Sequence, residues 1–138
     1  MTIRQQWMNA TVGIVAIGRN EGDRLQACLR SITLEEYPTV YVDSGSTDSS
    51  VSFAESLGVE VLNLDMTVPF TAARARNAGW IHLLDLYPNL TFIQFVDGDC
   101  IIQPNWLKDA QTCLEARPEA LKFASLNGDN VELEQILF

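Results

Sequence analysis

The sequence is short of basic side chains. Nine lysines and arginines stand against eighteen aspartates and glutamates, which gives a formal net charge of −9 at pH 7. A general nucleic-acid-binding protein carries a basic patch, so this balance argues against nucleic acid as a partner. It does not exclude a nucleotide, because a divalent cation can bridge carboxylates and a diphosphate.

Cysteine is also scarce, and long apolar runs are missing. Cys28, Cys100 and Cys113 are odd in number, lack zinc-ligand spacing and suggest no disulfide framework. We therefore expect three reduced, mostly buried thiols in a cytoplasmic protein. No apolar run approaches the roughly 20 residues that span a bilayer, and residues 1–10 do not resemble a signal peptide. Peripheral attachment to the inner face of a membrane stays open as an alternative.

Several catalytic signatures are absent. His82 is the single histidine and falls inside a helical pattern, so we interpret it as a surface or packing residue and expect no nucleophilic triad. The glycines form neither a G-x-G-x-x-G motif nor a P-loop. Dinucleotide-dependent enzymes and P-loop hydrolases therefore lack their main sequence signal here.

What the chain does contain is an alternation of short apolar runs and helical patterns over 138 residues, the size of one domain. Continuous apolar strands that alternate with helices are typical of a mainly parallel sheet with helices on both faces. We predict an α/β, Rossmann-like fold, with Asp23 capping its first helix. The expected strands cover residues 12–17, 39–43, 59–62 and 91–96. The expected helices cover residues 23–32, the stretch from the 44–48 turn to residue 57, residues 71–86 and residues 104–115.

Polar side chains follow the predicted strands directly. They lie at residues 18–21, 43–44, 65 and 97–99. Ligands of such sheets bind outside the carboxyl ends of the strands, so these residues are the candidates for a site. Carboxylates there are costly to desolvate without a compensating cation. The alternative is a role as turn formers and helix caps, which we favour for Thr47 and Asp48.

Asp97, Gly98 and Asp99 follow the fourth predicted strand. Residues i and i+2 of an extended segment point the same way, so both carboxylates can address one cation. Oxygen ligands suit Mg²⁺ or Mn²⁺, and the glycine between them lets a ligand approach the backbone. Aspartate-nucleophile phosphatases also carry Asp-x-Asp after a strand, but their strand lies near the N-terminus. The pattern therefore predicts a metal site at Asp97 and Asp99.

Two more features point to a bound nucleotide. Arg74 and Arg76 open the longest helix, where free N–H groups favour anions. They lie about 200° apart around a regular helix, so one faces the ligand and the other is solvated or bridges to an acid. Asp43 ends the second strand, where its carboxylate can accept a hydrogen bond from the imide N–H of uracil or thymine. A turn-capping role is the alternative for Asp43.

The order of these motifs resembles family 2 glycosyltransferases with the GT-A fold. The matching stretches are residues 14–21, 42–48, 75–79 and 95–99, and the resemblance extends over residues 12–117. It implies a metal ion at Asp99, with Asp97 as a second ligand. It also implies donor binding by Ile17, Arg19, Asn20, Glu21, Asp43, Ser44, Arg76, Asp97 and Gly98. Ser44 stands where many members have a second aspartate.

The resemblance further implies the reaction. It is inverting transfer of a sugar from a UDP- or dTDP-linked donor, with Mg²⁺ or Mn²⁺, to a saccharide or lipid-linked acceptor. The general base of the family lies on an acceptor-binding segment well beyond Asp-x-Asp, and residues 121–138 do not resemble that segment. We therefore expect residues 1–138 to form a single nucleotide-sugar-binding domain without most of the acceptor-binding half. We expect either a truncated product or a tail that has drifted from the family pattern.

Two other interpretations remain. A non-catalytic, nucleotide-binding remnant could self-associate as a homo-oligomer through residues 131–138, where Leu133, Ile136 and Leu137 offer an apolar edge. A nucleotidyltransferase of similar architecture would need a glycine-rich, basic loop after the first strand, and residues 18–21 contain one glycine.

Overall fold

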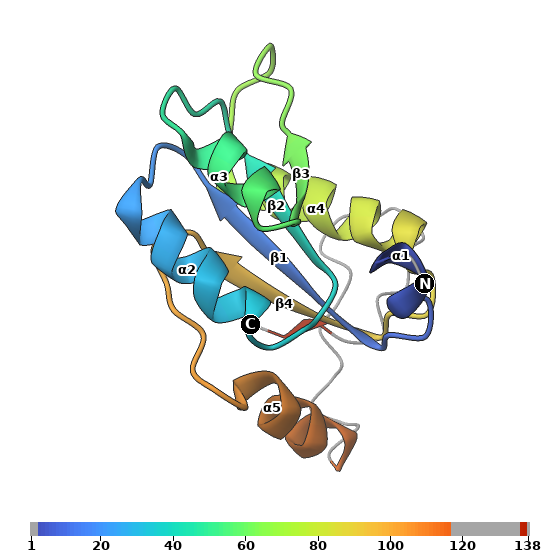
Figure 1. The fold of residues 1–138 in the computed structure, drawn as a ribbon. Helices are drawn as coiled ribbons and strands as arrows, with labels where there is room; N and C mark the ends of the chain where they lie inside the picture. The colour runs from blue at the N-terminus through green and yellow to red at the C-terminus, as the bar shows by residue number, and fades with distance from the viewer. Residues whose placement is uncertain (1–2, 117–135, 138) are drawn as a thin grey trace.

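Five strands form one sheet in the order β3-β2-β1-β4-β5, and every neighbouring pair is parallel (Figure 1). The computed structural model describes residues 3–116 and 136–137. Its strands are β1 (Val12–Gly18), β2 (Thr39–Asp43), β3 (Glu60–Asn63), β4 (Phe92–Asp97) and β5 (Ile136–Leu137). Its helices are α1 (Ile3–Gln6), α2 (Asp23–Thr33), α3 (Ser50–Ser56), α4 (Ala72–Leu86) and α5 (Trp106–Glu115). The predicted α/β, Rossmann-like fold is confirmed.

Strand β1 lies at the centre because its side chains are apolar on both faces. Val12, Ile14 and Ala16 pack into one hydrophobic cluster, and Val15 and Ile17 pack into a second. This division follows from the strand geometry, in which successive side chains point to opposite faces. A strand buried on both sides needs cover on both sides, which the helices provide.

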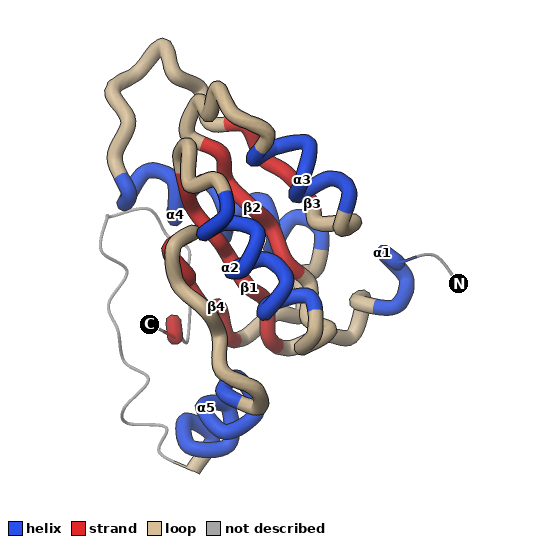
Figure 2. Tube along the Cα trace, turned by 60° about the vertical axis from the view of Figure 1, so that its left-hand side comes forward, coloured by secondary structure: helices blue, strands red, loops and turns tan. Residues whose placement is uncertain are grey.

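Helices α2 and α3 cover one face of the sheet, and α4 covers the other (Figures 1 and 2). The buried side of α2 consists of Leu25, Cys28, Leu29 and Ile32, which is the apolar face expected from the sequence. The α4 face is formed by Ala75, Gly79 and Leu83, spaced one helical turn apart. Helices on both faces were predicted, and this prediction is confirmed.

The close approach of α4 to the sheet depends on Gly79. A β-carbon at this position would lie 2.9 Å from Cγ2 of Val42 and closer still to Cγ1 of Val15. The absence of a side chain therefore lets the helix axis lie near β1 and β2. This contact fixes where the first turns of α4 stand relative to the ends of both strands.

Several boundaries differ from the expected ones. Asp23 is the first residue of α2 rather than its cap, because Gly22 occupies the N-cap position without a side-chain hydrogen bond. Val59 lies outside β3, since its N–H bonds to the carbonyl of Ala54. Helix α5 begins at Trp106 rather than at the proline, after Asn105 in a left-handed conformation with φ of 65°. The single turn α1 and the two-residue β5 are too short for a sequence pattern to predict.

The C-terminal tail falls mostly outside the described residues, including Leu133 and the rest of residues 131–135. Ile136–Leu137 form β5 and pair with Ile93 and Gln94 of β4 in the same chain. The backbone of two of the residues proposed for self-association therefore contributes to the sheet. None of the helices within the described residues is both long and apolar enough to cross a membrane.

Substitution of Gly79 by alanine tests the packing of α4. The new methyl group would overlap the side chains of Val15 and Val42, so we expect a loss of about 1–3 kcal/mol in the free energy of unfolding, although alanine favours a helix. Urea unfolding measures the change. Val15→Ala provides a control, because it should cost less stability in the Gly79→Ala background than alone. A Gly79→Ala protein as stable as the wild type would contradict this packing.

Candidate functional site

The carboxyl ends of β1, β2 and β4 meet at one edge of the sheet. In the pairing register Gly18 lies opposite Asp43 on β2, and Ile17 lies opposite Asp97 on β4. Strand β2 lies on one side of β1, and β4 lies on the other side. The strand order therefore reverses direction at β1, which makes the gap between β1 and β4 a topological switch point. Ligands of open α/β sheets bind at such a point. The sequence predicted a site at the carboxyl ends of the strands, and this remains a prediction.

Helix α4 brings a cation to this edge. Nη2 of Arg76 lies 2.9 Å from Oδ1 of Asp97, and the two side chains are 35% and 54% exposed. An ion pair this exposed contributes at most about 1 kcal/mol to stability, so a ligand can replace either partner at little cost. Arg76 is thus the arginine that faces the candidate site.

Arg74 bonds to the backbone of a loop instead. Its guanidinium donates to the backbone carbonyls of Val68, at 3.1 Å, and Pro69, at 3.5 Å, and to the carbonyl of Asp65. The divergence of the two arginines is confirmed. Its hydrogen-bond partners are carbonyls of the loop between β3 and α4. Its charge also helps to lower the pKa of Asp65, after the hydrogen bonds from Thr67, so the expected interaction with an acid is present in part.

The two carboxylates of the Asp97–Asp99 motif do not lie on one extended segment. Asp97 ends β4, and the N–H of Cys100 donates to the carbonyl of Asp97 at 2.9 Å, which closes a tight turn. The strand geometry that would align residues 97 and 99 therefore stops at Asp97. Asp99 is exposed and accepts a weak hydrogen bond from the Cys100 thiol at 3.5 Å.

Gly98 joins this turn to β1. Its N–H donates to the carbonyl of Ile17 at 2.7 Å, and a β-carbon on it would lie 3.0 Å from that same oxygen. The sequence suggested that this glycine admits a ligand to the backbone. The structure gives it a structural reason as well, since the end of β1 occupies that space.

Asp43 is held from within the protein. It is 3% exposed, and its carboxylate accepts one hydrogen bond from the Tyr41 hydroxyl and one from the Ser46 N–H, each at 2.8 Å. Burial and then the Asp43 carboxylate raise the pKa of Tyr41 above its usual value, so Tyr41 stays a neutral donor. Beside it, the 1%-exposed Ser44 donates its N–H to Gly18, while its Oγ has no hydrogen-bond partner among the described residues.

Asn20 ties the loops after β1 and β2 together. Its Oδ1 accepts from the N–H groups of Thr47, at 2.7 Å, and Asp48, at 3.3 Å, and its own N–H donates to the hydroxyl of Ser46 at 2.9 Å. Asp48 adds a contact in the other direction, accepting the N–H of Gly22 at 3.2 Å. The structural role favoured for Thr47 and Asp48 is thus consistent with these contacts, and Asn20 shares it.

The other expected residues of this edge vary in exposure. Ile17 is 8% exposed and Arg19 is exposed to solvent. Glu21 forms an ion pair with Arg24 at 3.0 Å, and its Cγ would lie 3.4 Å from a β-carbon on Gly98. The structure thus brings the residues after β1 beside the residues after β4.

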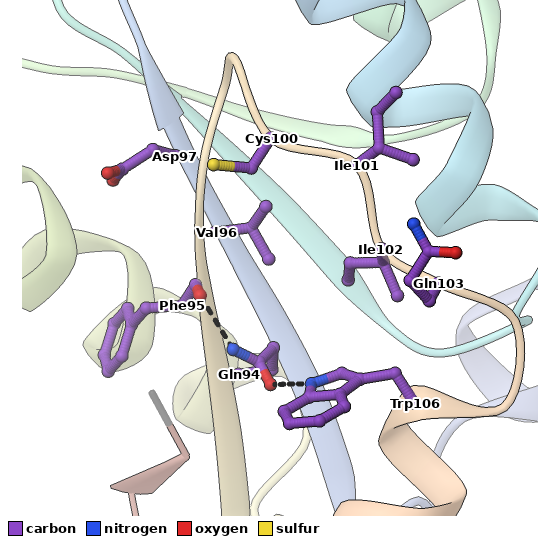
Figure 3. Close-up of a pocket in the computed structure, with 9 residues that line it drawn as sticks. All are labelled: Gln94, Phe95, Val96, Asp97, Cys100, Ile101, Ile102, Gln103 and Trp106. Atoms are coloured by element: carbon purple, nitrogen blue, oxygen red, sulfur yellow. Dashed lines mark hydrogen bonds between the residues drawn. The ribbon is translucent and has the colours of Figure 1, made fainter.

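A cavity that the sequence did not predict adjoins the motif. It measures about 330 Å³ and lies between the carboxyl half of β4 and residues 100–106 (Figure 3). The Trp106 indole N–H donates to Oε1 of Gln94 at 2.9 Å, which fixes the ring, and Asp97 lies at the other end of the lining residues. The volume is within the range of small-ligand sites. A glutamine inside an otherwise apolar strand was the one signal in the sequence.

The three cysteines are free, but only Cys28 is buried, which corrects the expectation of mostly buried thiols. The Cys28 thiol donates to the carbonyl of Asp97 at 3.8 Å, and burial raises its pKa to about 12. Burial and the neighbouring Asp99 raise the pKa of Cys100 as well. Both groups therefore remain thiols near neutral pH. His82 lies 3.0 Å from Glu60, between α4 and β3, and its side chain is 30% exposed, which is consistent with the expected surface or packing role.

Comparison with known proteins finds a matching family model and two curated relatives. The family model of glycosyl transferase family 2 matches residues 13–133. Glycosyltransferase AglE from Haloferax volcanii is 27% identical over 105 residues, which are 70% of this chain and 33% of that protein. A TPR repeat-containing protein from Synechococcus elongatus is 32% identical over 81 residues, which are 55% of this chain and 20% of that protein. The chain thus spans between a fifth and a third of these curated relatives.

Among solved structures, phosphoribosylglycinamide formyltransferase from Bacillus halodurans is similar with a TM-score of 0.41 and 12% identity. The similarity covers 70% of this chain and 50% of that chain. A similarity this weak carries no argument about function.

The Tyr41 hydroxyl offers a test of how Asp43 is held. Tyr41→Phe removes a buried donor to a carboxylate, so we expect a loss of about 1.5–3 kcal/mol in the free energy of unfolding, measured with urea at neutral pH. Tyr37→Phe, on a half-buried tyrosine, should cost much less. Equal losses in the two variants would contradict the special role of Tyr41.

The raised pKa of Tyr41 gives the same variant a pH signature. Folding favours the neutral phenol, so its contribution is complete below the ordinary value of 10.0 and is lost as the pH rises above that value. Wild-type stability should therefore fall above pH 10, and Tyr41→Phe should weaken that fall. An identical alkaline profile for both proteins would show that Tyr41 does not ionise as its burial requires.

Proposed function

The chain belongs to glycosyl transferase family 2, and from that premise we propose that its sheet edge binds the nucleoside diphosphate sugar donor of a glycosyl transfer reaction. The observation that carries the proposal is the position of Arg76. Its guanidinium lies 2.9 Å from Asp97, which is two residues before Asp99 in the chain and across β1 from Asp43. A guanidinium beside carboxylates is the arrangement expected where an anionic ligand arrives together with a metal ion.

The diphosphate is proposed to lie between Arg76 and Asp99. Arg76 stands in the first turns of α4, where the helix dipole adds to its positive charge. Because its pair with Asp97 is exposed and weak, the guanidinium can turn to a phosphate oxygen when the donor binds. Fixed positive charge at this point would stabilise the diphosphate as a leaving group.

Mg²⁺ or Mn²⁺ fits the donor set. Within the described residues no group of three or more metal-ligating side chains forms a cage. Mg²⁺ commonly binds through one or two carboxylates and completes its shell with substrate phosphates and water. Asp99, exposed and with only a thiol as its recorded donor, is the proposed ligand, and Asp97 is the second. When bound, the ion would neutralise charge on the leaving diphosphate.

The nucleoside is proposed to lie against β2 and the start of the loop after β1. Asp43 uses two of its roughly four acceptor positions inside the protein, which leaves acceptor capacity for the imide N–H of uracil or thymine. Because Asp43 is 3% exposed, a base would reach it with its edge. The Ser44 hydroxyl has no hydrogen-bond partner among the described residues, and this supports the same placement, since a buried polar group without a partner is costly unless a ligand supplies one. Ile17, Arg19, Asn20 and Glu21 complete the proposed lining.

The reaction proposed for the whole protein is inverting transfer to a saccharide or lipid-linked acceptor. This chain contributes the donor side, and its described residues do not include an assigned general base. Asp97 and Trp106 border the cavity beside the motif, which places room for a small group next to the proposed diphosphate position.

Calorimetry with UDP, dTDP, CDP, ADP and GDP tests the donor site. We expect UDP or dTDP to bind with Mn²⁺ or Mg²⁺ and much more weakly with a chelator present. Asp99→Ala should lower the metal-dependent affinity roughly tenfold or more, which corresponds to about 1.4 kcal/mol, while circular dichroism shows an unchanged fold.

Asp85→Ala is the matched control, because Asp85 is an exposed carboxylate on α4 away from the motif. Its affinity should equal that of the wild type. Absence of binding to all five nucleotides with either metal would overturn the proposed function. Equal affinity of Asp99→Ala and Asp85→Ala would overturn the role of Asp99 alone.

A further inference from the structure

The loop between β3 and α4 projects from the body of the protein, as both views show (Figures 1 and 2). Met66, Val68 and Phe70 in this loop are 41%, 48% and 44% exposed. No charged residue occurs from position 66 to position 73. We call residues 66–70 the apolar tip. Single exposed apolar residues are common on protein surfaces, but three in one projecting, uncharged loop are not.

Hydrogen bonds and packing contacts hold the apolar tip in a defined conformation. Asp65 Oδ1 accepts the N–H of Thr67 at 2.9 Å and its hydroxyl at 2.7 Å, which closes the base of the loop. Arg74 bonds to the carbonyl of Asp65, just before the tip, and to those of Val68 and Pro69 within it, and Thr71 caps α4 by accepting the N–H of Arg74 at 3.1 Å. Met66 packs over Gly45, where a β-carbon would lie 3.1 Å from its Cγ. The exposure of the side chains is therefore maintained by fixed contacts.

The same hydrogen bonds lower the free-energy cost of moving the tip from water into an apolar medium. Backbone carbonyls without partners are costly away from water, which excludes most loops from lipid. Here the Arg74 guanidinium satisfies the carbonyls of Asp65, Val68 and Pro69 from inside the loop. The proline has no N–H to satisfy. The tip can thus lose water on its outer side with fewer unpaired polar groups than an ordinary loop.

A lipid surface fits the tip better than a protein partner does. A stable protein interface uses about 20–30 residues on each side, whereas the tip offers five in a convex projection. Insertion into the interfacial zone of a bilayer requires only a few apolar side chains beside satisfied backbone. The net charge of −9 gives no general attraction to anionic lipids, so insertion would depend on apolar contact.

We propose that the apolar tip inserts into the interfacial region of a lipid bilayer and docks the protein on it. The tip follows the carboxyl end of β3, at the same edge as the candidate site, so docking holds that site close to the lipid surface. An acceptor that is itself anchored in lipid would then reach the site from the membrane. This orientation extends the proposed function, but the docking step itself does not require a bound donor.

Flotation with phosphatidylcholine vesicles tests the docking. The wild-type chain should float with the vesicles, and high salt should leave the bound fraction unchanged, because apolar contact is not screened. Val68→Ser combined with Phe70→Ser should lower the partition coefficient roughly tenfold or more. Met66 is left intact because it packs on Gly45.

Leu34→Ser is the matched control. Leu34 is 81% exposed and caps the far end of α2, at the opposite edge of the sheet. Its partition coefficient should equal that of the wild type. Wild-type protein that stays in solution, or an equal loss in both variants, would overturn the proposal. Binding only to anionic vesicles and only at low salt would do so too, as would a tip-dependent dimer in light scattering without vesicle binding.

Nucleotide calorimetry on the Val68→Ser, Phe70→Ser protein separates this proposal from the proposed function. Unchanged donor affinity together with lost vesicle binding supports docking as an independent property of the tip. Lost vesicle binding accompanied by lost donor affinity would show that the tip belongs to the donor site, and would overturn a separate docking role.

Discussion

Strand β1 pairs with β2 on one side and with β4 on the other, and the placement of the candidate site depends on this double pairing. The register sets Gly18 beside Asp43 and Ile17 beside Asp97. Two hydrogen bonds continue the ladder past the strand ends, from the Ser44 N–H to Gly18 at 3.0 Å and from the Gly98 N–H to Ile17 at 2.7 Å. A slip of one residue would turn every side chain of a strand to the other face, so the buried β1 allows no such slip. The floor of the site is therefore an extension of the sheet.

Carboxylates gathered at one edge of an acidic chain need compensation, and each receives a different kind. Asp43 has a neutral phenol and a backbone N–H, whereas Asp97 has a guanidinium. Among the described residues, the hydrogen-bond donor to Asp99 is the Cys100 thiol. A thiol is a weak donor, and the pKa of Cys100 is raised. The least compensated of these carboxylates, Asp99, is exposed to solvent. This asymmetry is the electrostatic reason for proposing Asp99 rather than Asp43 as the ligand of a cation from solution.

The sequence predicted the layers and the edge of the site, but only part of its chemistry. Strand positions followed from continuous apolar runs, and the site followed from the rule that ligands bind at carboxyl ends. The turn from Asp97 to Cys100 and the bonds of Arg74 to loop carbonyls could not be predicted, because both depend on where the backbone bends. Asn20 contacts Thr47 and Asp48, which are 27 and 28 residues away in the sequence. Helix and strand periodicity cannot predict contacts at that separation. Local patterns therefore indicate which edge of the sheet carries the candidate residues, whereas the contacts between those residues depend on long-range hydrogen bonds.

Helix α4 connects these features because its position leaves little freedom. Gly79 lets the helix pack closely against Val15 and Val42. Arg74 and Arg76 lie within two turns of Gly79 on its N-terminal side, and their side chains point in different directions. One holds the loop that carries the apolar tip, and the other reaches Asp97. A displacement of α4 would have to break the close contact at Gly79, so the loop and the cation are fixed relative to the same two strands. The loop that carries the apolar tip and the cation that reaches Asp97 are therefore both anchored to the first turns of one helix.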